Sequence, residues 1–359
     1  MNGKRGGVQG RVVGAGGGSD MSSSMKHRID RRDFMIGASA LGGATLIGIP
    51  SWAAAEPPPE IKKIRLLKLP AICLAPEYLA EELLRMEGFT DIEYVELYRS
   101  TTDELLIHNL ADMTFTAPPE LMPALDAGAP LVGLAGIHGG CYELFAHEHI
   151  RAIRDLKGKR IGVSAIGSLE YYFLASMVAY VGMDPRKDID WVDSKSFDGM
   201  KEDFVEKKVD AFFAFPPQPQ ELREKNIGRV IVNTAQDRPW EQYFCCMIVA
   251  RPEFVRQYPI ATKRAVRAIL KATDICASDP ERAAKHVVAK GFYPRYEIAL
   301  DVVKSLSYNR WRNRNPEDTL RFYGLRLYEG GMIKTAPQKL IAQGTDWRFL
   351  NELKNELKA

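Results

Sequence analysis

Hydrophobic and polar positions predict alternating strands and helices from residue 61 onward. The apolar-rich stretch Ile61–Leu69 ends at Pro70 and predicts a strand, because proline cannot continue a hydrogen-bonded ladder. Pro76–Gly88 has leucines at helical spacing, a proline in its first turn and a glycine at its end, which predicts a helix. The alternation continues to Ile137 and indicates an α/β unit with a largely parallel sheet.

A second alternating unit follows the first. Lys159–Ser164 predicts a strand, Gly167–Ser168 opens a helix, and from Pro252 onward the pattern is mainly helical. Two apolar, strand-like runs, Cys141–Ala146 and Phe244–Ala250, bracket this unit. We interpret them as crossings between two lobes. The sequence therefore predicts two α/β lobes and a helical C-terminal tail.

The N-terminal region carries an export pattern. Arg31 and Arg32 precede Phe34–Ala55, a stretch without charged residues that ends in three alanines. This resembles a twin-arginine signal peptide, which directs folded proteins across a bacterial inner membrane. It implies recognition by the twin-arginine translocon, cleavage near Ala55 and a periplasmic location. A membrane anchor is the alternative, but four glycines make the stretch only weakly apolar.

Removing residues 1–55 changes the charge balance. The whole chain has 49 basic and 46 acidic residues and a net charge of +3. Residues 1–55 hold seven of the basic and three of the acidic ones, so 42 basic and 43 acidic residues remain. A neutral mature chain gives no electrostatic reason to expect a nucleic-acid partner. Beyond Ala55, no apolar stretch is long enough to span a membrane.

The cysteines and histidines do not predict a disulfide framework or a metal site. Five cysteines are an odd number without regular spacing, and the adjacent pair Cys245–Cys246 lies in an apolar run that indicates buried free thiols. The segment His138–Cys141 and the pair His147 and His149 have metal-like composition. On a strand, however, His147 and His149 would point to opposite faces. We therefore expect no metal and no cofactor.

Several short segments, in this order, carry a family resemblance: Asp155–Val163, Gly167–Ser168, Val181–Asp184 and Val209–Phe212. They resemble the solute-binding proteins of ABC importers for nitrate, sulfonates, taurine and thiamine-pyrimidine precursors. The resemblance spans about residues 60–355.

It implies a type II periplasmic binding protein: an α/β fold with two lobes, two hinge-crossing strands and a helical C-terminal tail. The lobes would comprise residues 56–143 with 248–359, and residues 144–247. Residues 1–55 would be an unstructured N-terminus and the signal peptide.

Ligands of open α/β sheets bind beyond the carboxyl ends of strands, where loops lead into helix N-termini. Free N–H groups and the helix dipole favour an anion there, and aromatic side chains favour an organic ligand. Gly162 and Gly167 have phosphate-loop spacing, but the lysine of that motif is missing. The predicted ligand-binding residues are Pro70, Ile72, Cys73, Thr114, Thr116, His138, Ser164, Gly167, Ser168, Tyr171, Phe215 and Tyr243.

The expected function is capture of a small organic anion (a sulfonate, a carboxylate or a pyrimidine-like compound) by a monomer that delivers it to an ABC permease. This role needs no catalytic residue. One alternative is an exported enzyme related to the pyrimidine-forming synthases of thiamine precursors, which would carry pyridoxal on a lysine. Another is a ligand sensor that signals to a membrane receptor. Neighbouring genes would separate the importer from the sensor.

Overall fold

The computed structural model describes residues 56–69, 71–96 and 104–358. The chain divides into two units, Met1–Ala55 and Glu56–Ala359, and the account below concerns the second. The predicted signal peptide, with Arg31 and Arg32, and the predicted ligand residue Pro70 lie outside the described residues. Within these ranges, no helix is both long and apolar enough to cross a membrane.

Five strands form the first sheet region. β1 (Lys63–Lys68) pairs in parallel with β2 (Asp91–Glu96), and β10 (Phe244–Ala250) lies antiparallel between β3 (Met113–Thr116) and β4 (Val132–Gly139). Arg65 and Asp112 link the two groups. The Arg65 backbone N–H donates to an Asp112 carboxylate oxygen (2.9 Å), and the Asp112 N–H donates to the Arg65 carbonyl (2.9 Å).

The second region is a five-stranded sheet in the order β7-β6-β8-β5-β9. β6 is parallel to β7 and β8, whereas β5 is antiparallel to β8 and β9. Its strands are β5 (Glu143–Ala146), β6 (Arg160–Val163), β7 (Asp190–Asp193), β8 (Ala211–Ala214) and β9 (Arg229–Asn233).

The sheets are thus mixed, not largely parallel as predicted, because β5 and β10 run antiparallel to their neighbours. These two strands make up most of the apolar runs interpreted as crossings. The connections between the sheets precede them, at Gly140–Tyr142 and Thr234–Tyr243.

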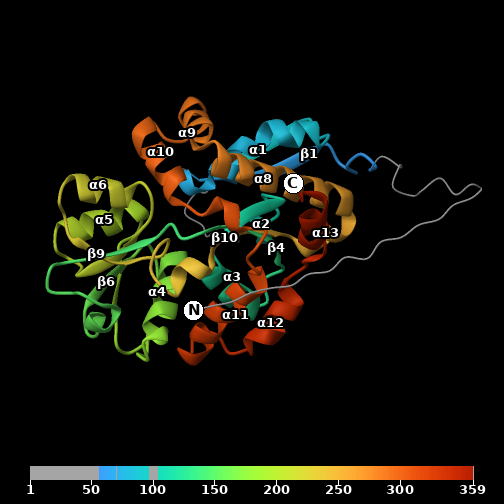
Figure 1. Ribbon diagram of the computed structural model, residues 1–359. Helices are drawn as coiled ribbons and strands as arrows, with labels where there is room; N and C mark the ends of the chain where they lie inside the picture. Colours follow the sequence, from blue (N-terminus) through green and yellow to red (C-terminus); the bar gives the residue numbers. More distant parts are fainter. Residues whose placement is uncertain (1–55, 70, 97–103, 359) are drawn as a thin grey trace, which may run out of the picture. The chain divides into compact units, whose positions relative to one another are not determined.

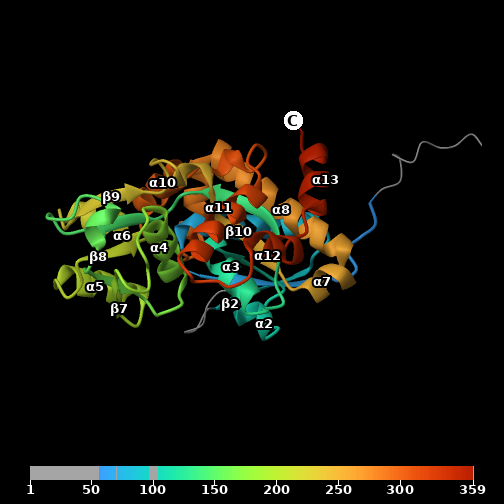
Figure 2. The ribbon, with the colours of Figure 1, turned by 90° about the horizontal axis from the view of Figure 1, so that it is seen from below.

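Thirteen α-helices lie in the described residues, and the last seven form the predicted helical tail. Within residues 56–358, α4, α5 and α6 surround the five-stranded sheet, while α1, α8 and α13 lie with β1, β4 and β10 (Figures 1 and 2). The helices are α1 (Ala75–Met86), α2 (Glu104–Ile107), α3 (Pro118–Asp126), α4 (Leu169–Tyr180), α5 (Phe197–Val205), α6 (Gln218–Glu224), α7 (Pro252–Gln257), α8 (Pro259–Ser278), α9 (Pro280–Ala289), α10 (Tyr296–Ser305), α11 (Pro316–Glu329), α12 (Pro337–Gly344) and α13 (Arg348–Glu356).

Helix α11 joins the two regions, because it packs on both α3 and α4. Tyr323 of α11 meets Phe173 of α4 edge to face, with ring centroids 5.1 Å apart. Polar contacts add to this link, since Arg295, just before α10, pairs with Glu224 of α6 at 2.8 Å. Both sheets are therefore held against the same tail helices.

The first residue of this unit is fixed to α8. The Glu56 carbonyl accepts a hydrogen bond from Arg264 (3.0 Å), and its carboxylate pairs with Arg267. Arg267 also pairs with the carboxylate of Glu87, which follows α1 and raises the pKa of the guanidinium. Glu56 is thus part of an ion-pair network on the surface of α8.

Candidate functional site

The two connections between the sheets meet at the side chain of Thr234. Its hydroxyl accepts hydrogen bonds from the N–H groups of Cys141 (3.2 Å) and Tyr142 (3.0 Å) and donates to the Tyr142 carbonyl (2.8 Å). Gly140 has φ +57°, and a Cβ there would lie 2.2 Å from the Ala235 Cα. Only glycine allows the two backbones to pack so closely. We call residues 140–142 and 234–235 the junction.

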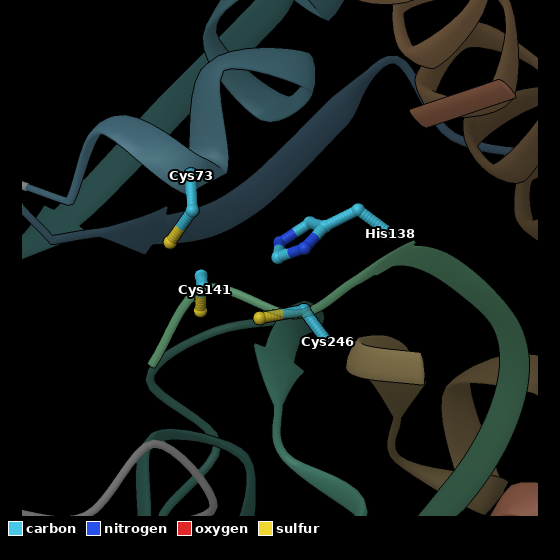
Figure 3. Close-up of side chains that lie close together, drawn as sticks. All are labelled: Cys73, His138, Cys141 and Cys246. Atoms are coloured by element: carbon cyan, nitrogen blue, oxygen red, sulfur yellow. The ribbon is translucent and has the colours of Figure 1, made fainter. Parts of the chain in front are cut away.

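Four side chains with metal-binding chemistry meet beside the junction: Cys73, His138, Cys141 and Cys246 (Figure 3). Taking one donor atom from each residue, all of these atoms lie within 4.8 Å of one another. None of the four residues is more than 8% exposed. We call them the thiol–imidazole cluster.

The cluster is assembled from segments far apart in the sequence. Cys73 lies in the 3₁₀ turn η2 (Ile72–Leu74) that follows β1, and Cys141 lies in the junction. On neighbouring strands β4 and β10, His138 and Cys246 are direct partners. Tyr308 packs edge to face on the His138 ring (5.3 Å) and donates its hydroxyl proton to the Cys73 carbonyl (2.9 Å), so it fixes two members of the cluster.

An irregularity in β10 brings both Cys245 and Cys246 close to Cys141. Neighbours on a regular strand point to opposite faces. The β10–β4 pairing shifts its register on both sides of Cys246, as in a β-bulge. The Cys245 sulfur consequently lies 2.9 Å from the Cys141 sulfur, while Cys246 remains in the cluster. All five cysteines are free and buried.

The sulfurs and the imidazole alter one another's protonation. Burial alone would lower the pKa of His138, but the neighbouring Cys246 and Cys73 sulfurs outweigh it and raise the pKa to about 10. A hydrogen bond from the Cys141 thiol contributes most to lowering the pKa of Cys246, to about 7. Neither ring nitrogen of His138 has a hydrogen-bond partner within the described ranges.

Three buried carboxyl groups lie at the starts of helices that follow strands. Glu77, Glu120 and Glu170 lie in the first turns of α1, α3 and α4, which follow β1, β3 and β6. The Thr116 hydroxyl donates to Glu120 (2.7 Å), and the Ser164 N–H donates to Glu170 (2.6 Å). Both carboxyl oxygens of Glu77 lack a hydrogen-bond partner in the described part of the chain, and burial raises its pKa well above the usual value.

Comparison with known proteins identifies the family. Residues 85–283, more than half of the chain, match the family described as NMT1/THI5 like. The chain belongs to the NMT1/THI5-like family. It is 26% identical over 172 residues to a protein of Brucella abortus (strain 2308) that is named as a binding protein. That match covers 48% of this chain and about half (53%) of the relative.

Solved structures show that this NMT1/THI5-like protein has the periplasmic binding protein fold. The periplasmic nitrate-binding protein NrtA from Synechocystis PCC 6803 superposes with a TM-score of 0.71 at 16% identity, over 84% of this chain and 90% of that one. The alkanesulfonate-binding protein SsuA from Xanthomonas axonopodis pv. citri gives 0.64 at 17% identity, over 82% and 100%. The desulfurization enzyme DSZB also shares the fold, with 0.55 at 17% identity, over 82% and 99%. The fold therefore serves both binding proteins and an enzyme.

Some predicted ligand residues come together in this family member, and others do not. Cys73 and His138 share the cluster, and Ile72 lies next to Cys73 in η2. Thr114 is buried in β3, where its hydroxyl lacks a partner among the described residues. Phe215 lies 5.9 Å from the Tyr142 ring, at the junction.

The remaining predicted residues lie in separate surroundings. Tyr243 stacks on Phe322 at 4.0 Å, whereas Tyr171 meets Trp191 edge to face at 4.8 Å. The Ser168 hydroxyl caps α4 by accepting the N–H of Tyr171 (3.4 Å). Ser164 supplies its N–H to Glu170, and Gly167 has φ +90° in the turn between them. One N–H group of the first turn of α4 is thus capped within the protein.

Sequence reasoning missed several members of the site: Cys141, Cys246, Tyr142 and the three glutamates. The sequence does not place Cys141 and Cys246 at one site, because neither a bulge nor a long-range pairing is visible in a single sequence. The glutamates did carry a signal. Glu77 and Glu120 each follow a proline-started helix turn directly after a predicted strand.

Proposed function

We propose that this protein is the extracytoplasmic solute-binding component of an ABC importer, a monomer that captures a small organic solute between two lobes and passes it to a membrane permease. The observation that carries this proposal is the junction. The chain passes between the two sheet regions at two segments that meet at Thr234, and the buried thiol–imidazole cluster lies beside them. Rotation about such a junction opens and closes the lobes around a ligand.

The buried glutamates bear on the class of solute. The sequence favours an anion at helix N-termini, yet Glu77, Glu120 and Glu170 already lie at three of them. Burial favours the uncharged form of Glu77 by raising its pKa, but an ionised carboxylate at either of the other two positions would oppose an anion about 6 Å away by about 3 kcal/mol at an effective dielectric of about 20. No lysine or arginine is among the fully buried residues of the described ranges. Of the three predicted classes, a pyrimidine-like solute that donates hydrogen bonds fits these groups better than a sulfonate or a carboxylate.

Aromatic side chains at the junction support a planar solute. Tyr142 stacks on Phe213 with centroids 4.6 Å apart, and Phe215 lies beside it. Phe173 meets Phe213 edge to face at 4.9 Å. Offset stacking on such a group stabilises a flat ring by about 0.5–1.5 kcal/mol beyond area burial. A planar heterocycle that packs against the partly exposed Phe215 ring could also donate hydrogen bonds to the carboxyl groups.

Isothermal titration calorimetry with an aminopyrimidine, an alkanesulfonate and nitrate tests the ligand class. We expect binding of the aminopyrimidine, weakened by Glu170→Gln. The matched control is Glu281→Gln, which changes an exposed first-turn glutamate of α9 and should leave binding intact. Binding of the alkanesulfonate or nitrate alone would contradict the pyrimidine assignment while preserving the importer role. Binding of none of the three would count against capture of a pyrimidine-like compound or a sulfonate.

Export by the twin-arginine route to the periplasm is the second part of the proposal. The second of the two units begins at Glu56, the residue after the predicted cleavage position. Mass spectrometry of the periplasmic protein should therefore find Glu56 at the N-terminus, and replacing Arg31 and Arg32 together by lysine should retain the precursor in the cytoplasm. Unchanged export of that double variant would refute the twin-arginine signal.

The enzyme alternative makes a different prediction. A pyridoxal enzyme would hold its cofactor on a lysine and would absorb visible light. We expect the purified importer component to be colourless and to bind its solute without converting it. Chromatographic recovery of the unchanged solute after incubation checks this expectation, and conversion would favour the enzyme.

A further inference from the structure

We propose that Cys73, His138, Cys141 and Cys246 bind one thiophilic metal ion, with Zn²⁺ as the expected ion. The sequence predicted no metal site, because the four residues lie on segments up to 173 positions apart. The fold brings them together beside the junction (Figure 3). The proposal does not depend on the importer role, since its test measures metal binding alone.

The donor set and its spacing fit four-coordinate zinc. Three cysteines and one histidine are a common set at structural zinc sites. With Zn–S near 2.3 Å and Zn–N near 2.0–2.1 Å, the donor atoms of a tetrahedron lie about 3.5–3.8 Å apart. The four donor atoms here lie within 4.8 Å of one another, so a small contraction would complete the site. Sulfur ligands disfavour Ca²⁺ and Mg²⁺, which prefer oxygen.

His138 provides an independent observation. Its side chain is fully buried, and neither ring nitrogen has a hydrogen-bond partner among the described residues. A buried polar group without a partner costs free energy, and native structures rarely leave one. Figure 3 shows the ring directed toward the sulfurs of Cys73 and Cys246. Coordination of a metal by one ring nitrogen would give this group the partner that the protein does not supply.

The proton balance follows from the ligand types. Zinc binds thiolates and neutral imidazole, so Cys73, Cys141 and Cys246 would each release any thiol proton they carry, and His138 any second ring proton, to solvent as the sulfur or nitrogen donates a lone pair to the ion. Three thiolates and one Zn²⁺ leave a net charge of −1. Neighbouring hydrogen-bond donors would have to support this charge, and the Thr234 contact already holds the backbone of Cys141 in place.

A disulfide is the main competitor for these thiols. The Cys141 and Cys245 sulfurs lie 2.9 Å apart, and an oxidant that took up two electrons and two protons could join them. That bond would consume one of the proposed ligands. Metal binding and this disulfide therefore exclude each other, and a thiol count distinguishes them.

The experiment uses the whole mature chain, purified with a reductant and treated with a chelator. Zn²⁺ and, separately, Co²⁺ are then titrated against a competing chromophoric chelator. We expect one ion per chain, with the charge-transfer and d–d absorption of tetrahedral thiolate coordination for Co²⁺. Cys73→Ser and Cys246→Ser should each weaken binding by more than about 100-fold, since loss of an outer-shell partner alone costs about 10–100-fold.

The matched control is Cys276→Ser. Cys276 is as buried as the ligands but lies in α8 outside the cluster, so its loss should leave affinity and the Co²⁺ spectrum unchanged. Circular dichroism of each variant confirms that it is folded. Cys245 is not among the four proposed ligands, so Cys245→Ser should leave the Co²⁺ spectrum unchanged. Three results would overturn the proposal: no binding by the reduced protein, equal weakening in Cys276→Ser, or a Cys141–Cys245 disulfide that persists in the protein isolated without reductant.

Discussion

The Thr234 hydroxyl makes a testable contribution to stability. Thr234→Val keeps the shape of the side chain but removes the acceptor for the N–H groups of Cys141 and Tyr142. The Tyr142 carbonyl keeps its hydrogen bond from the Thr234 N–H (3.0 Å), so two donors lose their partner. Both belong to buried residues. At about 1–3 kcal/mol for each unsatisfied buried group, the variant should lose about 2–6 kcal/mol of unfolding free energy.

Guanidinium chloride unfolding, followed by tryptophan fluorescence, measures this loss. The denaturation midpoint should fall while the m-value stays constant. Thr273→Val is the matched control, because Thr273 is equally buried but only donates to the Ile269 carbonyl of its own helix (2.9 Å). That variant should lose less than about 1 kcal/mol, and Thr234→Ser should retain most of the wild-type stability. If Thr234→Val costs no more than Thr273→Val, the hydroxyl does not hold the junction together.

Two further predictions concern stability. Gly140→Ala should lose at least about 2 kcal/mol more of the unfolding free energy than Gly291→Ala in the same assay. Both glycines have positive φ, which costs an alanine about 1–2 kcal/mol. Only the Cβ added at Gly140 would meet backbone atoms, at Ala235. Equal costs would show that the junction yields to a methyl group. The second prediction concerns Glu77 in protein kept metal-free by a chelator. Because burial raises the pKa of Glu77, its contribution to the free energy of unfolding is fully present below the pKa of an unfolded carboxyl group. That contribution falls by up to about 1.4 kcal/mol per pH unit as the pH rises through the pKa of the folded state. Glu77→Gln should therefore gain stability relative to wild type between about pH 5 and pH 7, and a pH-independent difference would contradict the raised pKa.

Local signals in the sequence accounted for most of the elements. Proline-started helices such as Pro76–Gly88 and apolar runs such as Lys159–Ser164 correspond to α1 and β6, because helix starts and buried strands depend on neighbouring residues. The strand directions were harder to predict. β5 and β10 follow the connections between the sheets, and nothing within either run determines which neighbour it will pair with.

The candidate site was only partly predictable for the same reason. The sequence predicts Cys73 and His138 as ligand-binding residues because one follows a strand and the other ends one, and ligands bind at strand ends. Their meeting with Cys246 depends on the β4–β10 pairing and on a register shift, both of which are tertiary features. The anion preference stays a prediction: it rests on N–H groups at the start of α4, of which that of Tyr171 is bonded to the Ser168 hydroxyl.

If the signal peptide that we propose is cleaved, the contacts of Glu56 with α8 have a kinetic consequence for its removal. Proteases bind their substrates as extended chain, and cleavage after Ala55 would require Glu56 and Pro57 to leave the guanidinium groups of Arg264 and Arg267 that hold them. Processing would then compete with docking of the same residues, so the lifetime of the precursor would depend on the strength of these ion pairs. Salt screens exposed charges and should shorten that lifetime. Folding and trimming of the N-terminus would thus be two events with a defined order.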